Sequence, residues 1–413
     1  MIRRPPRSTQ SRSSAASDVY KRQGLFGMGL VLGPTLGPTL GGYIIDHASW
    51  PLIFMINIPI GIIATFLSFT FIEKKEGEGK NKKHITIDYT GILLLMVGIG
   101  SLQYMLERGE SEDWFSSNTI IITSVLAVVG LIAFIWYELS IKSPAVNLKV
   151  LNNRNLAFTT IFTFVVGVGL FTSVFVFPVL AQRTLGYTAY ETGLTLLAPT
   201  MITVVMMPII GKLMSKGISP IPFVVIGFLL FAGYAWLSAG VSPDVNKNDF
   251  FLPLALRAVG ISMVQLPLIN QAVAGLQPKD YASGIALNNM IRQLGGAFGI
   301  ALANNYIARQ YAQHRYDLVS KVTGESQMFI ERSHTIAQSI ILKTGDVAGA
   351  GAQAIATINR VVDREAYFLS YLDTFRLITI FFILVIPLVG FLKVKKKSAA
   401  EMAATMKAAS EAH

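Results

Sequence analysis

Long apolar stretches, each ended by charged residues, glycine or proline, recur along the chain from residue 24 to residue 394. A helix needs roughly 20 mostly apolar residues to cross the hydrocarbon core of a bilayer, and these stretches have that length. The pattern predicts ten membrane-spanning helices at residues 24–45, 51–72, 88–106, 118–138, 155–180, 190–211, 220–240, 250–275, 284–307 and 373–394. The predicted fold class is therefore an all-α polytopic membrane protein.

Composition excludes several other classes of protein. Only 14% of the residues are charged and 52% are hydrophobic, whereas soluble domains carry about a quarter charged residues. The net charge of +11 would suit a nucleic-acid-binding protein, but the basic residues cluster in the short loops between apolar stretches, so we expect no nucleic acid. There is no cysteine, and the five histidines lie outside the apolar stretches, so no metal site is expected.

The loops between the predicted spans alternate in basic charge. One set of short loops holds only Arg108, Arg183 and Lys247. The other set, with the C-terminal tail, holds Lys74, Lys75, Lys80, Lys82, Lys83, Lys142, Lys149, Arg154, Lys212, Lys216, Lys279, Lys393, Lys395, Lys396, Lys397 and Lys407. Because basic loops stay in the cytoplasm, the C-terminus of this multi-pass protein is predicted to be cytoplasmic.

Three segments fall outside the predicted spans. Residues 1–23 are polar and basic and resemble a translated sequencing adapter, so we expect a non-native leader or, alternatively, a disordered basic arm. Residues 308–372 form a long periplasmic loop, and residues 395–413 form a cytoplasmic tail. Apolar residues at three- and four-residue intervals from Ile355 to Leu369 predict an amphipathic helix in the long loop. This helix either docks a periplasmic partner or packs on its own loop.

The first predicted span carries a repeated pattern of small residues. Glycines recur every four residues, at Gly29, Gly33, Gly37 and Gly41, and Gly42 follows the last of them. Two of these glycines are each followed by a proline, Pro34 and Pro38. Glycines at this spacing let a neighbouring helix approach closely, and proline removes a backbone hydrogen bond and bends the helix. We interpret this span as a bent helix that pivots against its neighbour. The alternative is a tight, static packing face.

This pattern, with Trp50, Ile53–Phe54 and Ile56–Gly61 after it, resembles the antiporter motif of the 14-span drug:proton antiporters (EmrB/QacA type) of the major facilitator superfamily. Pro51 departs from the family pattern. Further similarities are found at Asp88–Gly91, Arg108–Glu110, Asp113–Ser116, Gly211–Gly217, Ala282–Gly284 and Asn288–Gly299. The resemblance covers residues 24 to about 394, nearly the whole chain.

The resemblance implies a domain organisation. Residues 24–72 would be the last two spans of the N-terminal six-helix half, residues 88–138 two central linker spans, and residues 155–394 the C-terminal six-helix half. The first four spans of the family would then be missing, and with them the family's membrane carboxylate and main gating loop. The chain is therefore expected to be a ten-span fragment that does not transport by itself. Gly295, Gly296 and Gly299 would form the packing face in the C-terminal half that corresponds to the first span.

Charged side chains inside a span usually point to function, because an arginine at mid-bilayer costs roughly 2.5 to 3.5 kcal/mol on insertion scales. Arg257 and Arg292 lie inside predicted spans. Each either lines a cavity and pairs with a substrate or absent carboxylate, or extends along its alkyl chain to the nearer membrane surface. Asp88, Glu138 and Glu191 lie at span ends, where we expect solvated anchors rather than proton carriers.

The candidate cavity residues lie in the spans that line the central cavity of the superfamily. They are Phe171 and Phe175 in span 155–180, and Met263, Gln265 and Asn270 in span 250–275. Flexible methionine and aromatic walls with few polar points suit lipophilic compounds. The alternative is that these side chains face lipid or the helix core.

The predicted function is proton-coupled efflux of lipophilic or amphiphilic drugs by alternating access. An exporter of a specific metabolite, peptide or siderophore on the same fold is the main alternative. An enzyme is not expected, because no cluster of acidic residues or histidines lies near a membrane face; a scaffold without transport is a further alternative. The expected partners are small lipophilic substrates, the lipid bilayer and, if engaged, a periplasmic membrane-fusion adaptor with an outer-membrane channel. No cofactor is expected, because the proton gradient would supply the energy.

Overall fold

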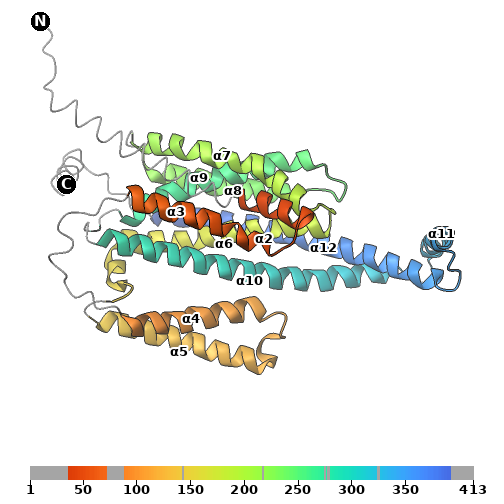
Figure 1. The fold of residues 1–413 in the computed structure, drawn as a ribbon, viewed down its shortest axis with the longest axis horizontal. Coiled ribbons are helices and arrows are strands. Elements are labelled where there is room, and N and C mark those ends of the chain that lie inside the picture. The colour runs from red at the N-terminus through yellow and green to blue at the C-terminus, as the bar shows by residue number, and fades with distance from the viewer. Residues whose placement is uncertain are drawn as a thin grey trace, which may run out of the picture.

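A computed structural model of the chain describes residues 36–71, 88–141, 144–215, 218–273, 276, 280–322 and 326–391. Within these ranges the chain is helical and contains no β-strand, which confirms the predicted all-α class (Figure 1). A short helix covers residues 36–47. It is followed by α2 (Leu52–Met55), α3 (Asn57–Phe71), α4 (Tyr89–Arg108), α5 (Asn118–Ser140), α6 (Arg154–Arg183), α7 (Ala189–Ser215), α8 (Pro220–Ser238), α9 (Phe251–Val273), α10 (Tyr281–Lys321), α11 (Gln327–Thr344) and α12 (Ala350–Val385).

Eight stretches of helix in the described residues are long and apolar enough to cross a membrane, so the predicted count of ten spans is not confirmed. The predicted span 24–45 is described only from residue 36. The predicted span 284–307 is part of α10, where Asn288, Asn289, Arg292 and Gln293 interrupt the apolar sequence. The helix nevertheless packs along the length of α6 within the bundle (Figure 1). Asn288 is buried and Arg292 partly buried there, whereas Asn289 and Gln293 are exposed; all but Gln293 reappear in the site described below.

Local sequence explains where the membrane helices begin and end. Asn153 caps α6, because its side chain accepts hydrogen bonds from the backbone amides of Asn155 and Leu156. Ser219 caps α8 and is followed by Pro220 at the first helical position, where a missing N–H costs nothing. At the other end of the chain α12 gives way to a 3-10 helix before Pro387, which cannot donate the next helical hydrogen bond.

Helices α6, α8, α9, α10 and α12 surround a common hydrophobic core rich in aromatic side chains. Phe382 of α12 lies 5.5 Å from the ring of Phe228 and 4.4 Å from that of Phe231, both in α8. Near the start of α6, a smaller cluster joins Leu156 to Val150 and Leu287. Helix α7 packs mainly against α9. The predicted C-terminal unit, residues 155–394, thus contains one packed bundle.

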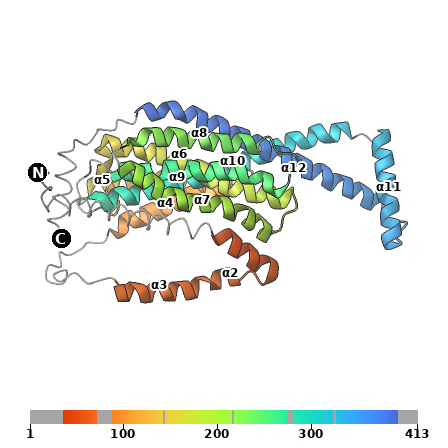
Figure 2. The ribbon, with the colours of Figure 1, turned by 90° about the horizontal axis from the view of Figure 1, so that it is seen from above.

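The hairpin of α4 and α5 lies beside this bundle and contacts it through α10 (Figure 1). Its two helices meet at Gly98 and Gly130, where a Cβ atom on Gly130 would lie 3.0 Å from the Cα of Gly98. Helices α2 and α3, by contrast, bury no residue, and α3 stands apart from the bundle in Figure 2. The predicted span 51–72 is divided at Ile56 into these two helices.

The predicted long loop 308–372 is mostly helical. Helix α10 continues to Lys321, α12 begins at Ala350, and the two extend together beyond the bundle to α11 (Figure 2). The predicted amphipathic stretch, Ile355 to Leu369, lies within α12. Polar contacts join the two helices: Asp363 accepts hydrogen bonds from the Tyr311 hydroxyl at 3.0 Å and from Nε of Arg315 at 2.7 Å. The two helices of this hairpin are therefore fixed to each other by specific side chains.

Candidate functional site

Helices α6 and α10 approach each other to backbone contact at four glycines. A Cβ atom on Gly167 of α6 would come closer than 3.0 Å to the carbonyl oxygen of Arg292, and one on Gly295 would do the same to the carbonyl oxygen of Phe164. Gly296 faces the ring of Phe171, and Gly299 faces the backbone of Val168. These contacts require residues without side chains, because no other residue leaves the space. The predicted packing glycines of α10 thus all face α6.

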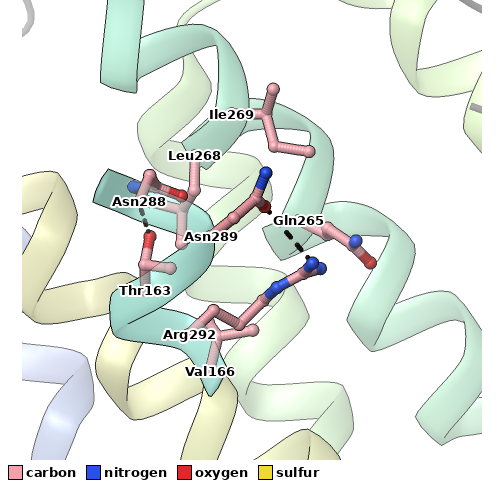
Figure 3. A pocket seen from close by; sticks show the side chains of 8 residues that line it. All are labelled: Thr163, Val166, Gln265, Leu268, Ile269, Asn288, Asn289 and Arg292. Carbon is pink, nitrogen blue, oxygen red and sulfur yellow. Dashed lines mark hydrogen bonds between the residues drawn. The ribbon is translucent and has the colours of Figure 1, made fainter. Parts of the chain in front are cut away.

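This close contact places a group of polar side chains between α6, α9 and α10 (Figure 3). Asn288 donates a hydrogen bond of 2.9 Å from Nδ2 to Oγ1 of Thr163, and Nη2 of Arg292 donates one of 3.3 Å to Oδ1 of Asn289. The pocket they form is lined by Thr163, Val166, Gln265, Leu268, Ile269, Asn288, Asn289 and Arg292. We call it the polar pocket.

The guanidinium of Arg292 dominates the electrostatics of the polar pocket. Among the described residues no carboxylate forms an ion pair with it, and its Nε atom is buried without a hydrogen-bond partner. A cation that is partly removed from water without a counter-ion has a strong preference for an anionic or hydrogen-bond-accepting ligand. The neighbouring amides supply both donors and acceptors, and Val166, Leu268 and Ile269 supply apolar surface.

Arg257 lies elsewhere, inside the bundle between α6, α8 and α9. It is only 6% exposed, so the alternative that it extends to the membrane surface is wrong. Its Nη1 donates a long hydrogen bond of 3.5 Å to the carbonyl oxygen of Ser173, and its guanidinium lies 5.7 Å from the ring centre of Tyr234. Neither contact neutralises the charge. Arg257 does not line the polar pocket.

The other predicted cavity residues are dispersed. Phe171 packs on Gly296, Phe175 packs against the hydrophobic core, and Met263 faces Gly227 of α8. Asn270 donates from Nδ2 to the sulfur of Met214 at 3.9 Å. Of this set, only Gln265 joins Arg292 in the polar pocket.

The remaining polar residues of the pocket, Thr163, Asn288 and Asn289, were not predicted as site residues, although Asn288 and Asn289 belong to a stretch that resembles the family. Two consecutive amides inside an apolar stretch are a signal that could have been read, since amides are costly in lipid and turn towards other helices.

The motif of the first predicted span is described from residue 36, so Gly29, Gly33 and Pro34 lie outside the described residues. The helix 36–47 lies against the start of α7. Oγ1 of Thr39 donates a hydrogen bond of 3.0 Å to the carbonyl oxygen of Gly193. A Cβ atom on Gly193 would lie 2.7 Å from the carbonyl oxygen of Pro38, whereas Gly37 and Gly41 have open space around them.

A second contact joins the same two helices nearer their ends. The backbone amide of Tyr190 donates a hydrogen bond of 2.9 Å to Oδ2 of Asp46, which lowers the pKa of that carboxyl below its usual value. Gly42 faces the backbone of Ala189, and the rings of Tyr43 and Tyr190 meet edge to face at 5.6 Å. The helix 36–47 is thus attached to α7 by backbone contacts at two levels.

The acidic residues at span ends differ in their surroundings. Glu191 is partly exposed and pairs with Lys247 at 2.5 Å between Oε1 and Nζ, as expected for a solvated anchor. The same expectation is wrong for Asp88 and Glu138, which are 8% and 0% exposed. The backbone amides of Ala145 and Val146, in the segment after α5, donate hydrogen bonds to the two buried carboxylates. Elsewhere in the described part of the chain, no three acidic or histidine side chains converge in an arrangement that could hold a metal ion.

Comparison with known sequences agrees with this architecture. A profile of the family described as Major Facilitator Superfamily matches residues 9–300. A probable multidrug resistance protein of Escherichia coli, EmrY, and a fatty acid resistance protein of Neisseria gonorrhoeae, FarB, are each 31% identical to this chain, over 89% of it and 70% of their own length. The multidrug export protein EmrB of Haemophilus influenzae is 32% identical over 71% of this chain and 57% of its own length.

Proposed function

Because this chain belongs to the major facilitator superfamily, we propose that it acts in the proton-coupled efflux of lipophilic and amphiphilic compounds across the bacterial cytoplasmic membrane. The names of its relatives support efflux: two are called multidrug proteins and a third a fatty acid resistance protein. In this proposal the proton gradient supplies the energy and no cofactor takes part. The C-terminus lies in the cytoplasm, in agreement with the basic loops.

The polar pocket is the observation that carries the proposal. It combines one cation, three amide side chains and an apolar wall, at the junction of α6, α9 and α10. The lining suits the polar or anionic head of an amphiphile, because Arg292 would bind the head, but the pocket has a volume of only about 10 Å³, so the helices around it would have to separate to admit the ligand. We therefore propose that amphiphiles with a negative head group are preferred substrates, and that Arg292 binds the head.

Alternating access requires two parts of the bundle to move against each other. The contact between the helix 36–47 and α7 suits this motion, because it is made of small residues and backbone atoms and has few interlocking side chains. Open space beside Gly37 and Gly41 leaves room for the helix to shift. We propose that this contact closes and opens in the transport cycle. The hairpin of α10 and α12 is proposed to face the periplasm and to offer a surface to a membrane-fusion adaptor that leads to an outer-membrane channel.

The polar pocket can be tested by binding to the chain in lipid nanodiscs. We expect a fluorescent long-chain fatty acid to bind, and Arg292→Gln to weaken this binding about tenfold, the loss expected for one charge-assisted hydrogen bond. Ethidium, a cation, should bind the variant as well as the wild type or better. Arg309→Gln is the matched control, because Arg309 is an exposed residue of the same helix outside the pocket. Equal loss of both ligands would show that Arg292 only maintains the fold.

Efflux itself can be tested in proteoliposomes with an imposed pH gradient. We expect the fluorescent fatty acid to move against its concentration gradient only while the pH gradient lasts, and to stop moving when a proton carrier is added. Movement that does not depend on the pH gradient would contradict proton coupling. Binding without movement in any condition would contradict efflux by this chain and would agree with the expectation from the sequence that it does not transport by itself.

A further inference from the structure

Asp88 and Glu138 come together at the joint between the α4–α5 hairpin and the segment that leads into α6. Asp88 caps the start of α4 and Glu138 lies in the last turn of α5, so the two reach the same end of the hairpin. A Cβ atom on Gly91 would come closer than 3.0 Å to an oxygen of each carboxylate. The two acidic groups therefore share one small space, and only glycine at position 91 leaves room for both.

Each carboxylate of this pair accepts hydrogen bonds from backbone amides. Asp88 accepts from the amide of Gly91 at 2.7 Å and from that of Ala145 at 3.3 Å, and Oε1 of Glu138 accepts from the amide of Val146 at 3.3 Å. The second oxygen of Glu138, Oε2, is buried and has no hydrogen-bond partner. The ionised form of Glu138 is unfavourable in this position, because Oε2 is removed from water and gains no hydrogen bond in return.

No positive charge offsets the pair among the described residues, where neither carboxylate forms an ion pair with a lysine or arginine. The elements packed around the pair carry several cations, and none of those described forms an ion pair with it. Lys149, in the 3-10 helix Leu148–Asn152, is exposed; Arg154 at the start of α6 lies over the ring of Phe158 at 5.5 Å; and Arg292 of α10 turns to Asn289. Lys142 lies outside the described residues.

We infer that the Asp88–Glu138 pair is a proton-binding site, with the proton held on Oε2 of Glu138. Two ionised carboxylates this close would repel each other in a buried site, and one proton on Glu138 removes the repulsion. The proton also turns Oε2 from an unpaired acceptor into a neutral hydroxyl. Loss of the proton would push the carboxylates apart and strain the hydrogen bonds to Ala145 and Val146, which connect the hairpin to the C-terminal bundle. This site is independent of the proposed efflux.

Infrared difference spectroscopy of the whole chain in nanodiscs tests the site, because a protonated carboxyl group has its own carbonyl stretching band. We expect this band at neutral pH in the wild type and its loss in Glu138→Gln. Glu107→Gln is the matched control: Glu107 is exposed at the other end of α4, where it accepts a hydrogen bond of 3.0 Å from Gln103, and its replacement should leave the band unchanged.

A second variant, Asp88→Asn, keeps the site testable even if Glu138→Gln does not fold. Asp88→Asn removes the neighbouring charge, so Glu138 should release its proton more easily and the band should titrate away at a pH at least about one unit lower. Absence of the band in the wild type at neutral pH would overturn the inference. Its persistence in Glu138→Gln, or an unchanged titration in Asp88→Asn, would also overturn it.

Discussion

Thr39 donates a hydrogen bond of 3.0 Å to the carbonyl oxygen of Gly193, and so joins the glycine-rich helix 36–47 to α7. Gly193 has no side chain, and this lets the backbone around Pro38 lie against it. In the proposed transport cycle this is the contact that opens and closes. Because the two helices are so close at Gly193, a substitution there can show whether the contact serves transport or only folding.

We expect Gly193→Ala to disrupt this contact, because the added Cβ would lie 2.6 Å from the Cα of Thr39 and 2.7 Å from the carbonyl oxygen of Pro38. Transport of the fluorescent fatty acid should fall about tenfold, with insertion and yield unchanged. Gly211→Ala is the control in the same helix, because its Cβ would meet only Leu266, at an ordinary 3.7 Å. Equal transport activities of the two variants would show that the contact between the helix 36–47 and α7 plays no part in the transport cycle.

Gly295→Ala should destabilise the C-terminal bundle, since the added methyl group would collide with the carbonyl oxygen of Phe164 and force α6 and α10 apart. Overpacking of this kind costs about 1 to 3 kcal/mol. Gly351→Ala, at an open position of α12, should be neutral or stabilising by up to about 1 kcal/mol, because alanine favours the helix. Thermal unfolding of the two variants in the same detergent compares them. A stable Gly295→Ala would show that the helices have room to separate.

Arg257→Met is expected to raise the thermal stability of the bundle. The guanidinium is buried without a carboxylate partner in the described part of the chain, and its Nε makes no hydrogen bond. The buried charge therefore lowers the stability of the bundle. A flexible apolar side chain of similar length removes this cost, with a gain of about 1 to 3 kcal/mol. Arg309→Met, at an exposed position, should change the unfolding temperature little. A large loss of stability in Arg257→Met would instead show that the contacts with Ser173 and Tyr234 stabilise the fold.

The contact between Asp46 and Tyr190 should depend on pH. The hydrogen bond from the Tyr190 amide stabilises the ionised carboxylate and lowers its pKa, so the contact contributes at neutral pH and weakens as the pH falls through the lowered pKa. Hydrogen exchange of the segment 188–193, corrected for the intrinsic rate, should show protection at neutral pH that is lost in acid. Asp46→Asn should lose part of this protection already at neutral pH. Protection that does not change with pH in the wild type would contradict this account.

The amino-acid sequence by itself determined the membrane class, the positions of most helices and the family. These properties depend on local composition: apolar length is set by the thickness of the bilayer, and helix ends are set by residues such as Asn153 and Pro220 that satisfy or spare backbone hydrogen bonds. The glycines of α10 could also be predicted as packing residues, because four-residue spacing places them on one face. The sequence could not predict that these glycines face α6 and contact Phe164 and Phe171.

Only the tertiary structure decided which polar groups meet. Asp88 and Glu138 are fifty residues apart in sequence, and each has the appearance of a solvated helix end; the loop through Ala145 and Val146 buries them together. Arg257 and Arg292 have similar places in their spans, yet one lies inside the bundle and the other in the polar pocket. The physical reason is that the extent of an apolar stretch places a residue along the helix axis, whereas its partners depend on how each helix is rotated against its neighbours.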